Sequence, residues 1–445
     1  MKSSSKKIIF IDIIILVIVA VVIGVSMAFT TDVELLFGLA YYDKVKVTPI
    51  DDGNGEATAP TDGAALYVHF VDVGQGDCTI IELPDGKTMI IDGGENNKTV
   101  ESAVQTFIDN TFDPDFKYFD YAILTHADSD HCGSLDYVLD KYPARFVYRP
   151  NVEAVGTKAN PYTDPGKADL SDDALSKNTA VYANAVKAMY YVSDDMTSVV
   201  YVTDPSVESQ TIKGGSGDDK YSFTFYSPLS TKYTGEGDWN NYSPIMILEY
   251  RGFKFAMSGD AEEKNLEEFV AKVNSAKTDD VTDKYDVFDG SYCVNVIKAG
   301  HHGSRNATTL DYLNVLTTDS GAAGVYCVVS CGEDNKYKHP HSEALERYKT
   351  IGVRDENILR TDIVGDITFS VRLDGTSAYK LFYGDKAAAE FKNVYTYNTI
   401  GSFELKWSVV GWIVLAVVAV GLAVHIAIVL TSDNKAQDKR GGRKN

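Results

Sequence analysis

The order of hydrophobic and polar positions predicts an alternation of strands and helices along most of the chain. Runs rich in β-branched and aromatic residues predict strands at 66–73, 78–83, 88–92 and 118–125. Short turn-forming stretches separate the first three, which indicates an antiparallel opening. Apolar residues at helical spacing predict helices at 98–110 and 134–142, before and after the fourth strand.

This alternation is interrupted by a polar stretch and then resumes. Residues 151–215 are rich in Asp, Asn, Ser, Thr and Gly, and we expect an insertion or lid there, with one helix near 179–191 and one strand near 198–203. Further strands are predicted at 221–226, 244–250, 253–257, 293–298, 325–330, 366–372 and 379–383, and helices at 261–273, 308–316 and 342–349. Strands that alternate with helices indicate an α/β fold whose sheets are covered by helices.

Two apolar stretches near the ends, 8–30 and 407–430, are each long enough to cross a bilayer, which takes about 20 apolar residues. Basic residues precede the first and follow the second, so the positive-inside rule predicts cytoplasmic termini and an extracytoplasmic middle in a cell-membrane protein. A cleaved signal peptide is the alternative for the first stretch. We expect an anchor at 1–30, a linker at 31–63, a domain at 64–384, a stalk at 385–406, a span at 407–430 and a basic tail at 431–445.

Charge and cysteine content narrow the function classes. The chain carries −21 overall, and its two ends carry +2 (1–30) and +3 (431–445), which leaves −26 for residues 31–430. So acidic a segment repels polyanions at long range, and binding of nucleic acid would need a local basic patch. The five cysteines contain no paired CxxC motif, which argues against a disulfide scaffold and a zinc knuckle.

The candidate chemistry is concentrated in one loop after the strand at 118–125. Within six residues this loop holds His126, Asp128, Asp130 and His131. Imidazole nitrogen and carboxylate oxygen are both ligands for zinc, manganese and iron. Four such side chains on one loop predict a metal site, and a solvated acidic loop is the alternative.

Other ligand-type residues also follow predicted strands. Asp92, His126, Asp260 and His301 each stand at or just after the carboxyl end of a strand, and such ends share the sheet edge where α/β folds build their sites. Six of the eight histidines form three close pairs, which are 126/131, 301/302 and 339/341. We therefore expect these segments to meet at one site.

The loop motif His126-x-Asp128-x-Asp130-His131, with Asp92-Gly-Gly upstream and Ser-Gly-Asp260 downstream, resembles the metallo-β-lactamase fold, a four-layer αββα sandwich of metal-dependent hydrolases. Three more segments are similar to the hydrolase domain of the ComEC/Rec2 competence family: Phe70-Val-Asp72-Val-Gly-Gln-Gly-Asp77, Lys298-Ala-Gly-His301-His302-Gly-Ser304 and His339-Pro-His341. The similarity spans about 66–383 and is weak over 151–215.

The resemblance implies two divalent ions, zinc or manganese. His126 and Asp128 would hold one ion; Asp130, His131 and one of His301 and His302 would hold the other, with Asp260 bridging both. Asp130 and Asp260 would thereby take part in catalysis. Lys298, Ser304, Lys338, His339 and His341 are candidates for binding a phosphate.

Two features depart from the fold's usual pattern. Asp128 stands where most members have a second histidine, and no histidine lies between 132 and 300. Asn240, Asn241 or Ser243 could take the place of the missing ligand. In addition, the competence family carries a multi-span channel, whereas this chain has two predicted spans, so DNA import is not implied.

The function expected from the sequence is a membrane-anchored, extracytoplasmic, metal-dependent hydrolase of phosphodiesters, with DNA as one candidate substrate. One alternative is a phosphodiesterase acting on small or cell-wall substrates, which the net charge favours. Another is a catalytically degenerate surface binding module. The sequence identifies no protein partner.

Overall fold

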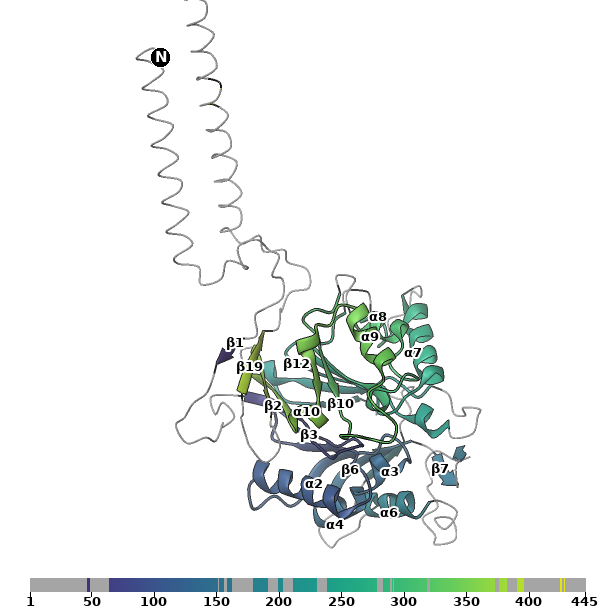
Figure 1. The fold of residues 1–445 in the computed structure, drawn as a ribbon. Coiled ribbons are helices and arrows are strands. Elements are labelled where there is room, and N and C mark those ends of the chain that lie inside the picture. The colour runs from purple at the N-terminus through teal and green to yellow at the C-terminus, as the bar shows by residue number, and fades with distance from the viewer. Residues whose placement is uncertain are drawn as a thin grey trace, which may run out of the picture. The chain divides into compact units, whose positions relative to one another are not determined.

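The structure is a computed structural model. It describes residues 46–48, 64–150, 152–155, 158–161, 179–190, 199–202, 211–229, 238–277, 283–288, 290, 292–317, 321–372, 376–381, 390–395, 425 and 428. The chain divides into two compact units, one of residues 44–398 and one formed by 1–43 with 399–445. All described residues except His425 and Ile428 belong to the first unit (Figure 1).

The predicted membrane spans at 8–30 and 407–430 lie outside the described residues, apart from His425 and Ile428. Within the part of the chain that is described, no helix combines the length and the apolar character needed to cross a bilayer.

Two large sheets form the middle of unit 44–398. The first has ten strands in the order β1-β19-β18-β17-β2-β3-β4-β5-β6-β9. Their bounds are β1 Lys46–Thr48, β19 Glu390–Tyr395, β18 Thr376–Leu381, β17 Ile367–Arg372, β2 Ala64–Phe70, β3 Thr79–Glu82, β4 Thr88–Ile91, β5 Phe119–Ile123, β6 Ala144–Arg149 and β9 Val199–Val202. Pairing is antiparallel from β1 to β4 and parallel from β4 to β9.

The second sheet has seven strands in chain order, β10 to β16. They are β10 Thr211–Gly214, β11 Tyr221–Phe225, β12 Met246–Tyr250, β13 Phe253–Met257, β14 Val296–Lys298, β15 Tyr326–Val329 and β16 Ile358–Arg360. Pairing is antiparallel from β10 to β13 and parallel from β13 to β16. A separate hairpin pairs β7 (Val152–Val155) with β8 (Lys158–Pro161).

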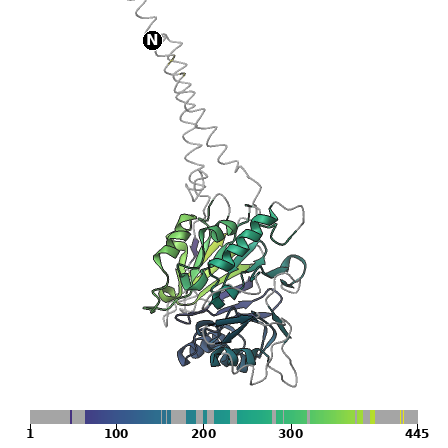
Figure 2. The same cartoon turned by 90° about the vertical axis from the view of Figure 1, so that its right-hand side faces the viewer.

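Helices cover the outer face of each sheet, which gives the four predicted layers (Figures 1 and 2). Beside the first sheet lie α2 (Lys98–Thr111), α4 (Leu135–Lys141) and α6 (Ala180–Met189); beside the second lie α7 (Glu263–Ala276), α8 (Leu310–Leu316) and α9 (Ser342–Thr350). Short helices are α3 (Ser129–Cys132), α10 (Thr361–Val364) and the 3₁₀ turns η3 (Gly217–Asp219), η4 (Asp238–Tyr242), η5 (Gly300–Gly303) and η6 (Asp355–Asn357). The α/β class with helix-covered sheets is confirmed.

Successive side chains along each strand enter different cores, one between the two sheets and one between a sheet and its helices. In β4, Met89 and Ile91 enter the core between the sheets, whereas Ile90 enters the core beneath the helices α2, α4 and α6. Alternating apolar residues in neighbouring strands of a sheet do the same because successive side chains point to opposite faces. Between the sheets, the Phe369 ring lies 6.3 Å from that of Phe70 and 5.9 Å from that of Phe255, so it links both sheets.

The interval 151–215 contains the predicted helix and strand, and both are integrated into the fold. Helix α6 contributes Tyr182, Val186 and Met189 to the core beneath the first sheet's helices, and β9 extends that sheet through parallel pairing with β6. Both elements lie at the predicted positions, and what the polar surroundings obscured is that they join the main fold.

Candidate metal centre

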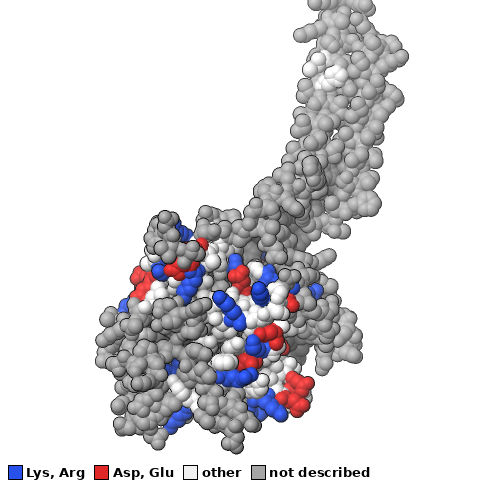
Figure 3. All heavy atoms as spheres, turned by 180° about the vertical axis from the view of Figure 1, so that it is seen from behind, with Lys and Arg blue, Asp and Glu red and all other residues white. Residues whose placement is uncertain are grey.

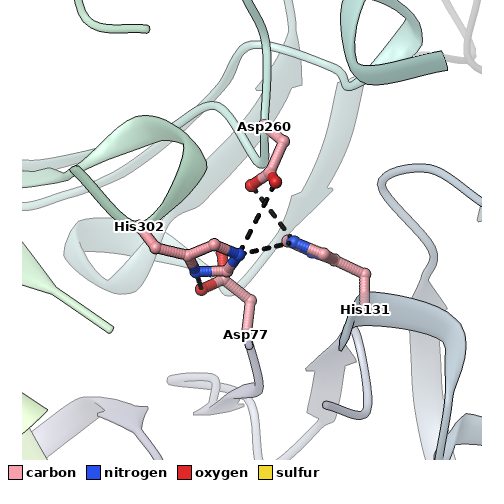
Figure 4. A group of neighbouring side chains, drawn as sticks. All are labelled: Asp77, His131, Asp260 and His302. Atoms are coloured by element: carbon pink, nitrogen blue, oxygen red, sulfur yellow. Dashed lines mark hydrogen bonds and ion pairs between the residues drawn. The ribbon is translucent and has the colours of Figure 1, made fainter. Parts of the chain in front are cut away.

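The candidate residues come from loops at the carboxyl ends of strands. In the first sheet, Asp92 follows β4, and His126 to His131 follow β5, ending in the single turn α3. In the second, Asp260 follows β13, and His301 and His302 form η5 after β14. The two edges face each other, so residues far apart in the sequence meet, as Figure 4 shows for four of them.

Asp77, His131, Asp260 and His302 form a compact buried group. One ligand atom from each lies within 4.8 Å of every other, and all four residues are buried. In Figure 4, Asp260 points at the two imidazoles, and the carboxylate of Asp77 lies beside His302. The sequence leaves the role of Asp77 open: a turn at Gly74-x-Gly76 would direct its carboxylate at the site, but aspartates that only stabilise turns are common.

Four histidine Nε2 atoms surround the Asp260 carboxylate. The nearest carboxylate oxygen lies 3.1 Å from Nε2 of His131, 3.6 Å from those of His301 and His302, and 3.8 Å from that of His126. The same Nε2 atom of His131 is 3.2 Å from Nε2 of His302. The structure thus gathers both histidine pairs around one carboxylate.

The other ring nitrogen of each histidine has a partner outside the centre. Nδ1 of His131 lies 2.7 Å from Asp92 Oδ2, and Nδ1 of His302 lies 3.0 Å from the Ser330 carbonyl oxygen. Nδ1 of His301 lies 3.0 Å from Glu262 Oε1, and Nδ1 of His126 lies 3.1 Å from the Thr125 hydroxyl. An Nδ1–H that donates to each partner leaves an Nε2 lone pair for a metal ion.

These atoms fit a divalent cation. Nε2 of His126 and Oδ1 of Asp260 are buried and have no hydrogen-bond partner, which is costly unless they bind something. With the Nδ1–H tautomers, imidazole lone pairs face a carboxylate and each other, an arrangement that requires positive charge between them. Nitrogen and carboxylate oxygen together suit zinc or manganese.

The closely packed carboxylates and imidazoles of the centre also shift one another's pKa values. Burial by itself lowers the pKa of His302, but Asp260 and Asp77 outweigh it and raise this pKa to about 10. Burial likewise opposes ionisation of Asp130, yet His302 and His131 hold its pKa at about 2. These shifts favour protonated histidines beside ionised carboxylates when no cation is bound. Metal binding would release those protons.

The remaining carboxylates of the 126–131 loop lie beside different histidines of the centre. Asp130 Oδ2 lies 3.2 Å from Nε2 of His302, beside His131. Asp128 Oδ2 lies 3.5 Å from Nε2 of His126, and its side chain is 36% exposed. The structure thus places Asp128 beside His126 and Asp130 beside His302, and the division of these residues between two ions stays a prediction.

Lys298 differs from its predicted role as a phosphate-binding side chain. It is 3% exposed, and its Nζ lies 2.7 Å from both carboxylate oxygens of Asp77. Burial raises the pKa of Asp77, but Lys298 and His302 together hold it well below the usual range, so the pair is ionic. Lys298 is thus committed to Asp77 within the protein.

The turn before Asp77 brings it to the centre. A Cβ on Gly76 would lie 2.5 Å from the Asp130 carbonyl oxygen, and the Asp77 N–H donates to that oxygen at 3.0 Å. Only glycine permits so close an approach of the two loops. The Gly-x-Gly-Asp spacing was the sequence signal for a role of Asp77.

His339 and His341 lie beside the histidines of η5. The His339 ring centroid is 5.4 Å from that of His301 and 4.8 Å from that of His341. Burial, followed by the neighbouring histidines, lowers the pKa of His339 to about 4, so it is neutral near pH 7. Nδ1 of His341 accepts from the Arg305 N–H at 3.1 Å. Ser304 is buried, and Lys338 is exposed.

The three candidates for the missing mid-chain ligand have different surroundings. Ser243 Oγ accepts from the Asp260 N–H at 3.1 Å, and Asn241 Oδ1 accepts from the Asn265 N–H at 3.1 Å. Asn240 Nδ2 donates to Glu262 Oε1 at 3.4 Å, the same oxygen that faces His301. Sequence reasoning missed Glu262, although an acidic residue two positions after Asp260 was a signal.

Behind the Gly-x-Gly turn, Asp366 is expected to make stability depend on pH. Burial raises its pKa to about 6, and its Oδ1 accepts from the Asp72 N–H at 2.7 Å. A carboxyl group whose pKa is higher in the folded state favours folding at low pH, and this contribution is lost as the pH rises through about 6. Between pH 4 and 7 the free energy of unfolding should fall by up to about 2 kcal/mol relative to Asp366→Asn. Parallel pH profiles of the two proteins in urea unfolding would contradict this.

Comparison of the sequence with known proteins finds one matching family and several competence proteins. The profile described as the metallo-beta-lactamase superfamily matches residues 71–231. ComE operon protein 3 of Bacillus subtilis (strain 168) is 23% identical over 314 residues, which cover 68% of this chain and 32% of that protein. Competence protein ComA of Neisseria gonorrhoeae is 27% identical over 176 residues, which cover 39% of this chain and 22% of that protein.

The chain thus spans about a third or less of the length of these relatives. Among solved structures, the isothiocyanate hydrolase from Delia radicum gut bacteria is similar with a TM-score of 0.31 and 11% identity, over 66% of this chain and 95% of that one. The superfamily match and the competence relatives agree with the buried His/Asp centre at the strand ends. The chain is thus similar to the metallo-β-lactamase superfamily over residues 71–231 and, over a longer stretch, to competence proteins of the ComEC type.

Proposed function

We propose that this chain is a divalent-metal-dependent phosphodiesterase with nucleic acid among its substrates. The observation that carries the proposal is the set of four histidine Nε2 atoms within 3.8 Å of the Asp260 carboxylate, each histidine being held through Nδ1 from outside. The superfamily supports a metal-dependent hydrolase, and the competence relatives favour a phosphodiester as the bond that is cleaved.

His126, Asp128 and Asp260 would hold one zinc or manganese ion, and Asp130, His131, His302 and Asp260 a second. When bound, such ions lower the pKa of water and polarise a phosphoryl oxygen. Asp92 and the Ser330 carbonyl orient the rings of His131 and His302, which keeps both Nε2 atoms directed inward.

The residues at the rim would bind the substrate. His301 is 23% exposed at its side chain and is held by Glu262, and His339 packs against it. A ring N–H of His339 can donate a hydrogen bond to a phosphate oxygen, and His301 can do so from Nε2 when its ring is protonated. Lys338, exposed beside His339, supplies a positive charge for the same group. These groups would orient the phosphodiester against the buried centre.

We also propose that the domain is extracytoplasmic and anchored in the cell membrane at both ends. The apolar stretches 8–30 and 407–430 and the basic residues outside them support this orientation. Reaction of single introduced cysteines with a membrane-impermeant thiol reagent in whole cells tests it. Labelling of a cysteine at 435 in the absence of lysis would contradict cytoplasmic termini.

The activity is tested with the full chain purified in detergent. We expect hydrolysis of bis(p-nitrophenyl) phosphate and of an oligonucleotide, loss of both activities after treatment with a chelator, and recovery with zinc or manganese. Metal should also raise the melting temperature because it binds the folded state alone. Hydrolysis that is unaffected by chelation would exclude the proposed centre.

A further inference from the structure

The loop after β15, residues 331–341, is built rigidly beside the centre. Asn335 Nδ2 donates to the carbonyl oxygens of Gly332 and His339 at 2.8 and 2.7 Å, and its Oδ1 accepts from the His339 N–H at 2.9 Å. The Gly332 N–H donates to Gln75 Oε1 at 3.3 Å, which ties this loop to the Gly-x-Gly turn. The side chains that it presents are therefore preorganised.

Tyr337 is the aromatic side chain that this loop exposes. It is 49% exposed, and its ring stacks on His339 with the centroids 5.6 Å apart and the planes inclined by 20°. A single exposed tyrosine is ordinary on a protein surface. This one is joined to the centre by a second ring contact, of 5.4 Å, between His339 and His301.

Two lysines flank this tyrosine. Lys336 Nζ lies 4.7 Å from the Tyr337 ring centroid, and Lys338 is exposed on the other side in the sequence. Among the described residues, neither lysine makes an ion pair with a carboxylate within 4.0 Å. On the face drawn in Figure 3, Lys and Arg lie among Asp and Glu. Lys336 and Lys338 thus place two ammonium groups next to Tyr337, whereas Glu333 and Asp334 at the start of the same loop are exposed carboxylates. A polyanion would therefore contact the lysine end of the loop.

We propose that Tyr337 stacks on an unpaired base of the nucleotide next to the scissile phosphodiester, while Lys338 binds the scissile phosphate and Lys336 the adjoining one. This inference rests on the proposed function and specifies its substrate as single-stranded nucleic acid. A base inside a duplex is already stacked on its neighbours and must be extruded before a side chain can stack on it, whereas a base in a single strand is available.

The test compares three substrates of the metal-supplemented full chain: a single-stranded oligonucleotide, an oligonucleotide of the same length with abasic sites, and bis(p-nitrophenyl) phosphate. Tyr337→Ala should lower kcat/KM on the first substrate by roughly tenfold, mainly through KM, because one base-stacking contact is lost. Its effect on the two substrates without bases should be much smaller. Tyr337→Phe keeps a ring and should restore most of the activity on the oligonucleotide.

Tyr118→Ala is the matched control. Tyr118 is 41% exposed and, like Tyr337, has a cation over its ring, in this case Arg145 at 5.8 Å. It immediately precedes β5, whose opposite end leads into the metal loop, so its replacement should leave all three activities unchanged.

The outcomes separate this inference from the proposed function. An equal loss on all three substrates would mean that Tyr337 only supports His339, and no loss on the base-bearing oligonucleotide would mean that no base stacks there. Either result overturns the inference while hydrolysis stands. A wild-type chain that hydrolyses none of the substrates in the presence of metal overturns the proposed function as well.

Discussion

Replacing Asp260 by alanine is expected to reduce phosphodiester hydrolysis by about 1000-fold or more and to lower the content of bound metal. Asp260 is 1% exposed, and its carboxylate is the one group that all four Nε2 atoms approach. Loss of an ion that stabilises the transition state by several kcal/mol corresponds to a factor of this size. The measurements are kcat/KM on bis(p-nitrophenyl) phosphate and elemental analysis of the same sample.

Two further variants make this result specific. Asp140→Ala removes an exposed carboxylate of α4 and should change neither quantity. Asp260→Asn keeps the shape but not the charge, and we expect it to resemble Asp260→Ala because a neutral amide does not offset the charge of a cation. Hydrolysis by Asp260→Ala within tenfold of the wild type would show that catalysis does not need this carboxylate.

The elements of the fold could be predicted where the local pattern decides them. Strand β5 and helices α2 and α4 have strong periodicity, and each lies within two residues of its predicted bounds. Pairing between distant segments leaves no such local pattern. Strand β17 pairs with β2, about 300 positions earlier in the chain, and completes the first sheet between two blocks of strands. Strands β9 and β19 take their places in the same way.

The candidate site, too, could be predicted from the sequence only where its residues are close together in the chain. The ligand-type residues of 126–131 share one loop and were evident from their spacing, and the structure brings Asp260 and both η5 histidines to them. The roles of His301 and His302 depend on backbone geometry that no residue pattern specifies. Both have positive φ, of 49° and 54°, and this turn buries His302 fully while it leaves His301 at the rim.

The ion pair of Asp77 and Lys298 was beyond sequence reasoning because 221 positions separate its members. The pair sits under the centre, since Asp77 Oδ1 also lies 3.2 Å from Nδ1 of His302. In the sequence, a lysine at the end of a strand and just before two histidines is as consistent with phosphate binding as with a buried ion pair. Only the tertiary structure shows that it neutralises a buried carboxylate instead.

Lys298→Met is therefore expected to lower the free energy of unfolding by about 3–5 kcal/mol, the usual result of removing one member of a buried ion pair. Methionine fills much of the same volume, so the loss comes from the Asp77 charge that stays behind without its partner. Both side chains are almost fully buried, at 3% and 7% exposure, and little solvent can compensate. The measurement is urea unfolding followed by intrinsic fluorescence, in the presence of a chelator so that metal binding does not contribute.

The double variant Asp77→Asn/Lys298→Met tests this cause. It removes the unpaired charge along with the ammonium, so we expect it to be more stable than Lys298→Met alone, with a coupling free energy of up to about 3 kcal/mol. The pKa of Asp77 is held well below the usual range, which means that the wild-type pair stays ionised at mildly acidic pH and that its contribution persists there. If the double variant were no more stable than the single one, the loss would have to come from packing around the strand β14 rather than from charge.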